Sequence, residues 1–113
     1  MKVFLKFIVF VILLMYSNIS TGQVIVSQFN AGWNSANKVT WLGKLTDVDK
    51  VKYIDIAANP KAQQKYKIVV VPTIIVFKDG SEVKRFQADI SFSMKATRSE
   101  IQSVIDDSKM SDY

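Results

Sequence analysis

The sequence predicts an α/β fold with a four-stranded mixed sheet flanked by helices, in the chain order β-α-β-α-β-β-α. Short runs rich in β-branched residues alternate with segments that begin at helix-capping residues, which favours strands joined by helical connections. The third run, residues 73–78, is almost entirely apolar, as expected for a central strand buried on both faces. Asp79-Gly80 follows this run directly and is the strongest hairpin signal in the chain.

The first half of this pattern comprises a strand, a helix and a second strand. Residues 24–29 are mostly β-branched and apolar and predict the first strand. Asn34 can cap a helix that runs to about residue 45. Apolar residues recur there at helical spacing, namely Ala36, Val39, Trp41, Leu42 and Leu45. Residues 51–56 predict the second strand, which a right-handed crossover places parallel to the first.

The second half adds a short helix, a hairpin and a final helix. Asn59-Pro60 predicts a helix start, because proline at the first helical position loses no hydrogen bond, and this helix runs to about residue 66. After the Asp79-Gly80 turn, residues 82–87 are expected to return antiparallel to the central strand. Thr97-Arg98-Ser99-Glu100 is a capping box that predicts a last helix to about residue 107. One face of this helix carries Ile101, Val104 and Ile105.

The N-terminal segment, residues 1–22, predicts a secretory signal peptide. Lys2 and Lys6 stand at the head of the apolar run 7–16, and the small residues Ser20 and Gly22 suit cleavage near residue 22. The run is too short to favour a membrane-spanning helix, although an uncleaved N-terminal anchor stays open as the alternative. We therefore expect an exported protein, periplasmic or secreted, with one domain at 23–108 and a tail at 109–113.

Composition excludes several classes of chemistry. The chain has no cysteine, so its own side chains cannot carry out dithiol–disulfide exchange, and no histidine, so histidine-based acid–base catalysis and histidine metal sites are absent. We expect no cofactor and no metal. The net charge of +5 falls by two, to +3, when Lys2 and Lys6 leave with the signal. Lysines are scattered among carboxylates without a concentrated basic face, which argues against nucleic-acid binding.

Five motifs in register resemble the thioredoxin-like family. Residues 29–38 read Phe-Asn-Ala-Gly-Trp-Asn-Ser-Ala-Asn-Lys, which is similar to the Phe-x-Ala-x-Trp-Cys-x-x-Cys-Lys frame of thioredoxins. The second strand followed by Asn-Pro is matched by residues 53–60. Lys-Tyr-Lys-Ile at 65–68, Val-Pro-Thr at 71–73 and Phe-Lys-Asp-Gly at 77–80 come after it. The resemblance extends over about residues 24–107 and implies the minimal thioredoxin-like fold, without the family's extra N-terminal strand and helix.

The departures from this family concern its redox chemistry. Asn34 and Asn37 occupy the positions of the two redox cysteines, so we expect no catalytic residue there. Gln28 stands where thioredoxins often carry a buried aspartate, and Tyr53 corresponds to the lysine that pairs with it. The resemblance therefore implies a fold that lacks both the sulfur atoms and the proton-handling groups, and we lean against enzymatic activity.

The same resemblance implies a peptide-binding groove. Thioredoxin-like proteins hold extended peptides beside a cis-proline that corresponds to Pro72, and the backbone of the preceding residue, here Val71, pairs with the peptide. The sequence leaves open whether Trp33 lies in this groove or packs in the core. The predicted binding residues are Trp33, Asn34, Val71, Pro72, Thr73 and Phe92.

Residues 88–94 form a segment that is longer than its usual counterpart in the family. Ala88, Ile90, Phe92 and Met94 alternate with polar residues, which predicts an extended segment with one apolar side. Two interpretations stay open: the apolar side covers the end of the core left bare by the missing N-terminal elements, or it is a lid or partner-binding edge. Asp89 stands near the place of a family glycine.

These observations predict a non-redox domain that binds an exported protein or peptide beside Pro72. One alternative is a structural or dimerisation module that uses the 88–94 edge. Another is a thioredoxin-family protein that assists redox chemistry performed by a partner. A protein or peptide partner is expected, with membrane contact only through the N-terminal segment, and the oligomeric state stays open.

Overall fold

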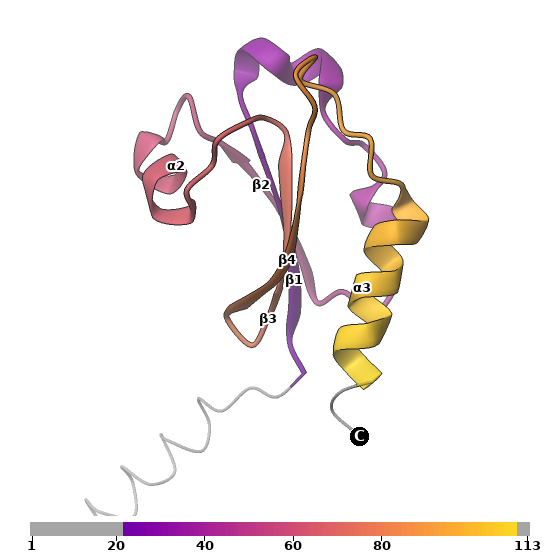
Figure 1. Ribbon diagram of the computed structural model, residues 1–113. Coiled ribbons are helices and arrows are strands. Elements are labelled where there is room, and N and C mark those ends of the chain that lie inside the picture. The colour runs from indigo at the N-terminus through magenta and orange to yellow at the C-terminus, as the bar shows by residue number, and fades with distance from the viewer. Residues whose placement is uncertain (1–21, 111–113) are drawn as a thin grey trace, which may run out of the picture.

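Four strands form one mixed sheet in the order β2-β1-β3-β4 (Figure 1). The computed structural model describes residues 22–110, so the predicted signal peptide, apart from Gly22, lies outside the described residues. Strands β1 and β2 are parallel, whereas β3 is antiparallel to both β1 and β4. This topology confirms the predicted fold class. The strands are β1 (Val24–Asn30), β2 (Lys50–Asp55), β3 (Thr73–Lys78) and β4 (Ser81–Gln87).

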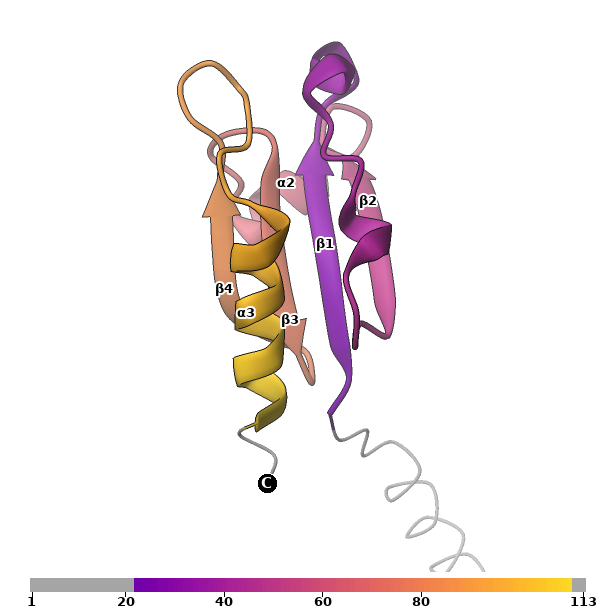
Figure 2. The same ribbon diagram turned by 90° about the vertical axis from the view of Figure 1, so that its right-hand side faces the viewer.

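Two α-helices cover opposite faces of the sheet, α2 (Pro60–Tyr66) on one side and α3 (Arg98–Met110) on the other (Figures 1 and 2). Asn59 caps α2 as predicted, because its side chain accepts from the Ala62 N–H. Thr97 Oγ1 accepts from the Glu100 N–H at 3.1 Å and caps α3, which continues past residue 107 to Met110. Within residues 22–110, neither helix is long and apolar enough to cross a membrane.

The crossover from β1 to β2 is not the α-helix that its apolar spacing predicted. Two short 3₁₀ helices take its place, η1 (Gly32–Asn37) and η2 (Leu42–Lys44). An α-helix across 34–45 requires the Val39 N–H to donate to the carbonyl of residue 35. Instead this N–H donates to Gln28 Oε1 at 2.8 Å, and the Val39 carbonyl accepts from Gln28 Nε2 at 2.9 Å. The buried Gln28 amide therefore holds Val39 in a non-helical conformation.

The sheet has an apolar core on each face. β3 supplies both, since Ile74 and Val76 face α3 whereas Ile75 packs on the other side. This confirms that the third strand is central and buried on both faces. The core on the α3 face comprises Val24, Val26, Val39, Leu42, Leu45, Ile74, Val76, Ile101 and Ile105. The core on the α2 face comprises Phe29, Ala31, Ile56, Ile68, Val71 and Ile75.

The β3–β4 hairpin forms at the predicted Asp79-Gly80 turn. Both residues have positive φ, 51° and 85°, as a two-residue type I′ turn requires. The Asp79 carboxylate also accepts from the Gln23 N–H at 3.0 Å and so holds the start of β1. This end of the sheet lies far from the segments described next, which gather where β1 ends.

Candidate functional site

Three segments that are distant in the sequence meet at the end of the sheet where β1 stops. They are η1, the Val71–Pro72 segment before β3, and residues 88–94 after β4. Figures 1 and 2 show η1 and the loop after β4 at this same end of the molecule. The predicted binding residues are therefore close in space, although they differ strongly in exposure.

Asn34 connects these segments. Its side chain is buried, with the residue only 5% exposed. Nδ2 lies 3.0 Å from Asn30 Oδ1, 3.2 Å from the Phe92 carbonyl and 3.5 Å from the Val71 carbonyl. Asn34 Oδ1 accepts from Asn37 Nδ2 at 2.9 Å. The residue at the family's first cysteine position is thus a neutral hydrogen-bonding link and has no nucleophilic atom.

Trp33 lies on the surface, not in the core. It is 68% exposed and meets Phe92 edge to face, with the ring centroids 5.2 Å apart and the planes at 89°. This is a favourable aromatic geometry. Phe92 is 41% exposed, and the neighbouring Ile90 is 98% exposed. We call Trp33, Ile90 and Phe92 the aromatic surface.

Val71, Pro72 and Thr73 lie beneath the surface. Val71 is 4% exposed, and Pro72 and Thr73 are almost fully buried. The Val71–Pro72 peptide bond is cis. Thr73 Oγ1 donates to the Val70 carbonyl at 2.6 Å, and the Ala88 N–H donates to the Pro72 carbonyl at 3.0 Å. Of the six predicted binding residues, only Trp33 and Phe92 therefore present substantial area to solvent.

The 88–94 segment is a turn, so the predicted extended conformation is wrong. The Phe92 N–H donates to the Asp89 carbonyl at 3.0 Å, and the Asp89 N–H donates to the Ser93 carbonyl at 3.2 Å. Asp89 Oδ1 accepts from the N–H groups of Ser91, at 2.9 Å, and Ser93, at 3.4 Å. Such local side-chain bonds compete with extended backbone, and they outweigh the alternating apolar pattern here. Phe92 accordingly has a φ of 61°.

The two interpretations of this segment apply to different residues. Met94 and Ala96 pack against the core on the α3 face, as the covering interpretation expects. Ile90 and Phe92 point elsewhere, and both remain exposed in the aromatic surface. The segment therefore covers the core with its C-terminal part and lies beside Trp33 with its tip.

The Asp89 carboxylate is the charged group that stabilises this turn. Its pKa is lowered from the ordinary value, first because the Ser91 hydroxyl donates to the carboxylate. The N–H groups of Ser91 and Ser93 and the Lys95 ammonium, 3.5 Å from Asp89 Oδ2, act in the same direction. The ionised carboxylate thus favours the turn that places Phe92 beside Trp33.

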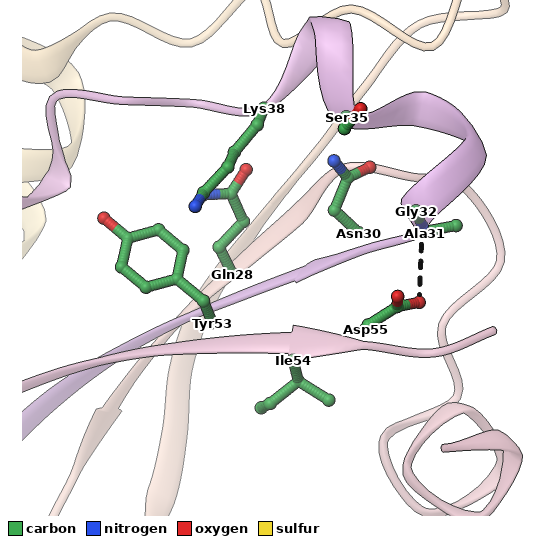
Figure 3. A pocket seen from close by; sticks show the side chains of 9 residues that line it. All are labelled: Gln28, Asn30, Ala31, Gly32, Ser35, Lys38, Tyr53, Ile54 and Asp55. Carbon is green, nitrogen blue, oxygen red and sulfur yellow. Dashed lines mark hydrogen bonds between the residues drawn. The ribbon is translucent and has the colours of Figure 1, made fainter. Parts of the chain in front are cut away.

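Gln28, which the resemblance sets at the position of the family's buried acid, has a fully hydrogen-bonded amide. Gln28 is 1% exposed, and both ends of its side chain bond the Val39 backbone. Tyr53 is its cross-strand partner on β2 but is 48% exposed, with the Lys38 ammonium 4.3 Å from its ring centre. Figure 3 shows these residues around a hollow of about 210 Å³ that opens beside η1.

Asn34 and Asn37 leave this end of the sheet without the thiol nucleophiles of the family's redox members. Ser35 is exposed in η1, and the chain has no histidine to serve as its base. Within residues 22–110, no cluster of acidic residues is arranged to hold a metal ion. Sequence reasoning overlooked Asn30, whose Nδ2 donates to the Asn34 carbonyl at 3.1 Å. The recurrence of asparagine at 30, 34 and 37 was the available signal for this network.

Comparisons with known proteins agree with the fold and with these motifs. The chain matches thioredoxins over short stretches: 40% identity over 42 residues with Mycobacterium tuberculosis thioredoxin, and 35% over 48 residues with Staphylococcus aureus thioredoxin. These matches cover 37% and 42% of this chain, and 35% and 43% of the relatives' own lengths. The chain thus spans well under half of these curated relatives. No family model matches.

Solved structures extend the similarity to most of the chain. Fasciola hepatica thioredoxin is 32% identical with a TM-score of 0.56, and the alignment covers 83% of this chain and 86% of that one. Thioredoxin 1 from Thermosipho africanus superimposes with a TM-score of 0.58 at 21% identity, covering 79% and 99%, which supports the fold alone. Fold and frame together define a thioredoxin-like domain. The chain belongs to the thioredoxin-like family and lacks the cysteine pair of its redox members.

Proposed function

We propose that this protein is a non-redox thioredoxin-like domain that binds an extended segment of an exported protein on its aromatic surface, beside Pro72. The observation that carries the proposal is the 68% exposure of Trp33, which meets an exposed Phe92 at the position of the family's redox site. Tryptophan is enriched among the residues that dominate binding energy at protein interfaces. A tryptophan left in water at this position is therefore better explained by a partner than by folding.

Binding without redox chemistry is consistent with the residues below this surface. Asn34 and Gln28 are both buried and hydrogen-bonded, and neither side chain exchanges protons in the ordinary pH range. Their bonds hold η1, the loop and the crossover in fixed positions. A fixed platform reduces the ordering cost that binding must overcome.

The proposed contact lies on the aromatic surface and not on the Val71 backbone. Val71 is 4% exposed, so strand-like pairing with it requires the neighbouring groups to move. Trp33, Phe92 and Ile90 need no rearrangement to meet an apolar side chain. We place this contact outside the cytoplasm, because residues 1–22 have the composition of a secretory signal.

Selection from a library of random peptides on the immobilised protein tests the proposal. Peptides selected by the wild-type protein should bind Trp33→Ala and Phe92→Ser at least about tenfold more weakly, because truncation removes an apolar contact worth about 1–2 kcal/mol or more. Val83→Ser is the matched control, since Val83 is 44% exposed on β4, near the opposite end of the sheet. Equal affinities for wild type and both aromatic variants would show that the aromatic surface is not the binding site.

A second candidate is self-association through the same surface, favoured by the 98% exposure of Ile90 beside Phe92. In that case sedimentation should show a dimer, and Phe92→Asp should convert it to a monomer. A wild-type monomer at the highest soluble concentration would exclude this function.

A further inference from the structure

β2 is an outer strand of the sheet. Its inner side pairs with β1 from residue 50 to residue 55, and no strand among the described residues pairs with its outer side. Lys50, Lys52 and Tyr53 are exposed along it. The outer side therefore offers backbone groups to which another extended chain can add.

A hollow lies on each face of this strand. Figure 3 shows that Tyr53 and Ile54 point to opposite sides of β2. The hollow of about 210 Å³ lies on the Tyr53 side and includes Lys38 in its lining. A second hollow of about 350 Å³ lies between β2 and α2, lined among others by Ile54, Tyr66 and Asn59. Alternate side chains of an added strand point to opposite faces, so each hollow can receive one set.

The hollow beside α2 is lined by lysines without a carboxylate, whereas the hollow on the Tyr53 side is lined by both Lys38 and Asp55. Lys52, Lys61 and Lys65 line the hollow beside α2. No carboxylate of the described residues forms an ion pair with these three lysines. Asp55, at the end of β2, is held by backbone groups, since its Oδ1 accepts from the N–H of Gly32 at 3.3 Å and of Ala57 at 2.9 Å. Lys38 lies over the Tyr53 ring and Lys65 over the Tyr66 ring, and neither forms an ion pair within residues 22–110, so both ammonium groups can still meet an external anion.

We propose that the β2 edge binds an extended acidic segment of a partner protein by strand addition. Main-chain hydrogen bonds to β2 supply affinity, and carboxylates over the two hollows meet Lys38 on one face and Lys52 and Lys65 on the other. Lysines on an edge strand also discourage pairing between identical chains. The exposed Lys50 and Lys52 therefore disfavour a second copy of this chain as the occupant. This surface is separate from the aromatic surface and does not depend on the function proposed for it.

The test uses a synthetic peptide in which pairs of threonine alternate with pairs of glutamate, so that glutamates lie on both faces of the added strand, and the same peptide with lysine in place of glutamate. Binding is measured by titration calorimetry, and amide hydrogen exchange locates the contact. The Thr-Glu peptide should bind, slow the exchange of amides on β2, and weaken as salt is added. The double charge reversal Lys52→Glu with Lys65→Glu should weaken its affinity at least about tenfold. Lys84→Glu, on the opposite edge strand β4, is the matched control and should change the affinity little.

Two results would overturn the inference. One is a Thr-Glu peptide that binds no more tightly than the Thr-Lys peptide. The other is protection from exchange that maps to β4 or to the aromatic surface while the amides of β2 exchange unchanged. Exchange is read separately at β2 and at the aromatic surface, so the test distinguishes failure of this inference from failure of the proposed function.

Discussion

At the scale of single residues, two amides define the difference between this protein and its redox relatives. Asn34 and Gln28 each use both ends of the side chain, one as donor and one as acceptor. A neutral amide can be buried at low cost when both ends are bonded, whereas a buried acid shifts its pKa and a thiol donates only weakly. Asn34 and Gln28 therefore serve as structural links in this protein, at positions where the resemblance implies redox and proton-transfer groups.

Asn34→Ala should lower the free energy of unfolding by about 1–3 kcal/mol. It removes the buried donor to the Phe92 and Val71 carbonyls and leaves the Asn30 side chain without that partner. Urea denaturation measures the change. Asn37→Ala is the control, because Asn37 is exposed and makes one of these bonds, so its loss should cost less than about 1 kcal/mol. Equal losses for the two variants would contradict the linking role of Asn34.

The candidate site could be predicted from the sequence only in part. The resemblance predicted that Trp33, Asn34, Pro72 and Phe92 lie at one end of the sheet, because residues that match a family's motifs are expected at the same places in its fold. Exposure did not follow from the motif: Trp33 is at the surface, and Val71 is buried. The exposure of Trp33 depends on tertiary contacts, which the periodicity of the sequence does not specify. The same is true of the hydrogen bonds between Asn30 and Asn34.

At the scale of elements, local hydrogen bonds prevailed over hydrophobic periodicity twice. The Gln28 amide binds the Val39 backbone and breaks the crossover into η1 and η2. The Asp89 carboxylate turns the 88–94 segment, although its apolar residues alternate as in a strand. The elements predicted correctly were those whose caps and turns agree with their periodicity, such as α2, α3 and the Asp79-Gly80 hairpin.

The 88–94 turn should loosen in acid. The pKa of Asp89 is lowered in the folded protein, chiefly by the Ser91 hydroxyl, so the stabilisation is complete above the ordinary pKa of the carboxyl group. It is lost as the pH falls through the lowered pKa, because the protonated group no longer accepts these bonds as strongly. The protection of the Ser91 and Ser93 amides, measured by NMR as the exchange rate relative to the intrinsic rate at each pH, should fall in that range.

Asp89→Asn supplies the control for this titration, since its amide does not ionise. In this variant, the protection of the Ser91 and Ser93 amides should not fall as the pH passes through the range in which Asp89 becomes protonated. A carboxyl resonance of Asp89 that titrates at its ordinary pKa would show that the Ser91 bond does not hold the turn in solution.

At the scale of the whole molecule, the fold was predictable because its main sequence signals agree, although the crossover and the 88–94 segment do not follow their apolar pattern. The chain order, the apolar central strand and the two capped helices all specify one mixed sheet with a core on each face. Disulfides contribute nothing to this fold, since the chain has no cysteine. Packing against β3 holds the domain together.

The purified protein should neither reduce insulin disulfides nor change its urea midpoint when dithiothreitol is added. Thiolate attack is the chemical step of disulfide exchange, and no side chain of this chain supplies a thiolate. Insulin turbidity and paired denaturation curves measure the two effects, with a cysteine-containing thioredoxin as positive control. Turnover that persists through further purification would contradict a non-redox role.

Trp33 fluorescence during peptide binding tests the proposed function most directly. In a Trp41→Phe variant, Trp33 is the sole tryptophan, and its indole is largely in water. Titration with a peptide selected on the wild-type protein should shift the emission of Trp33 to shorter wavelength in parallel with calorimetric binding, because the partner removes water from the ring. Saturable binding with an unchanged Trp33 emission would contradict the account.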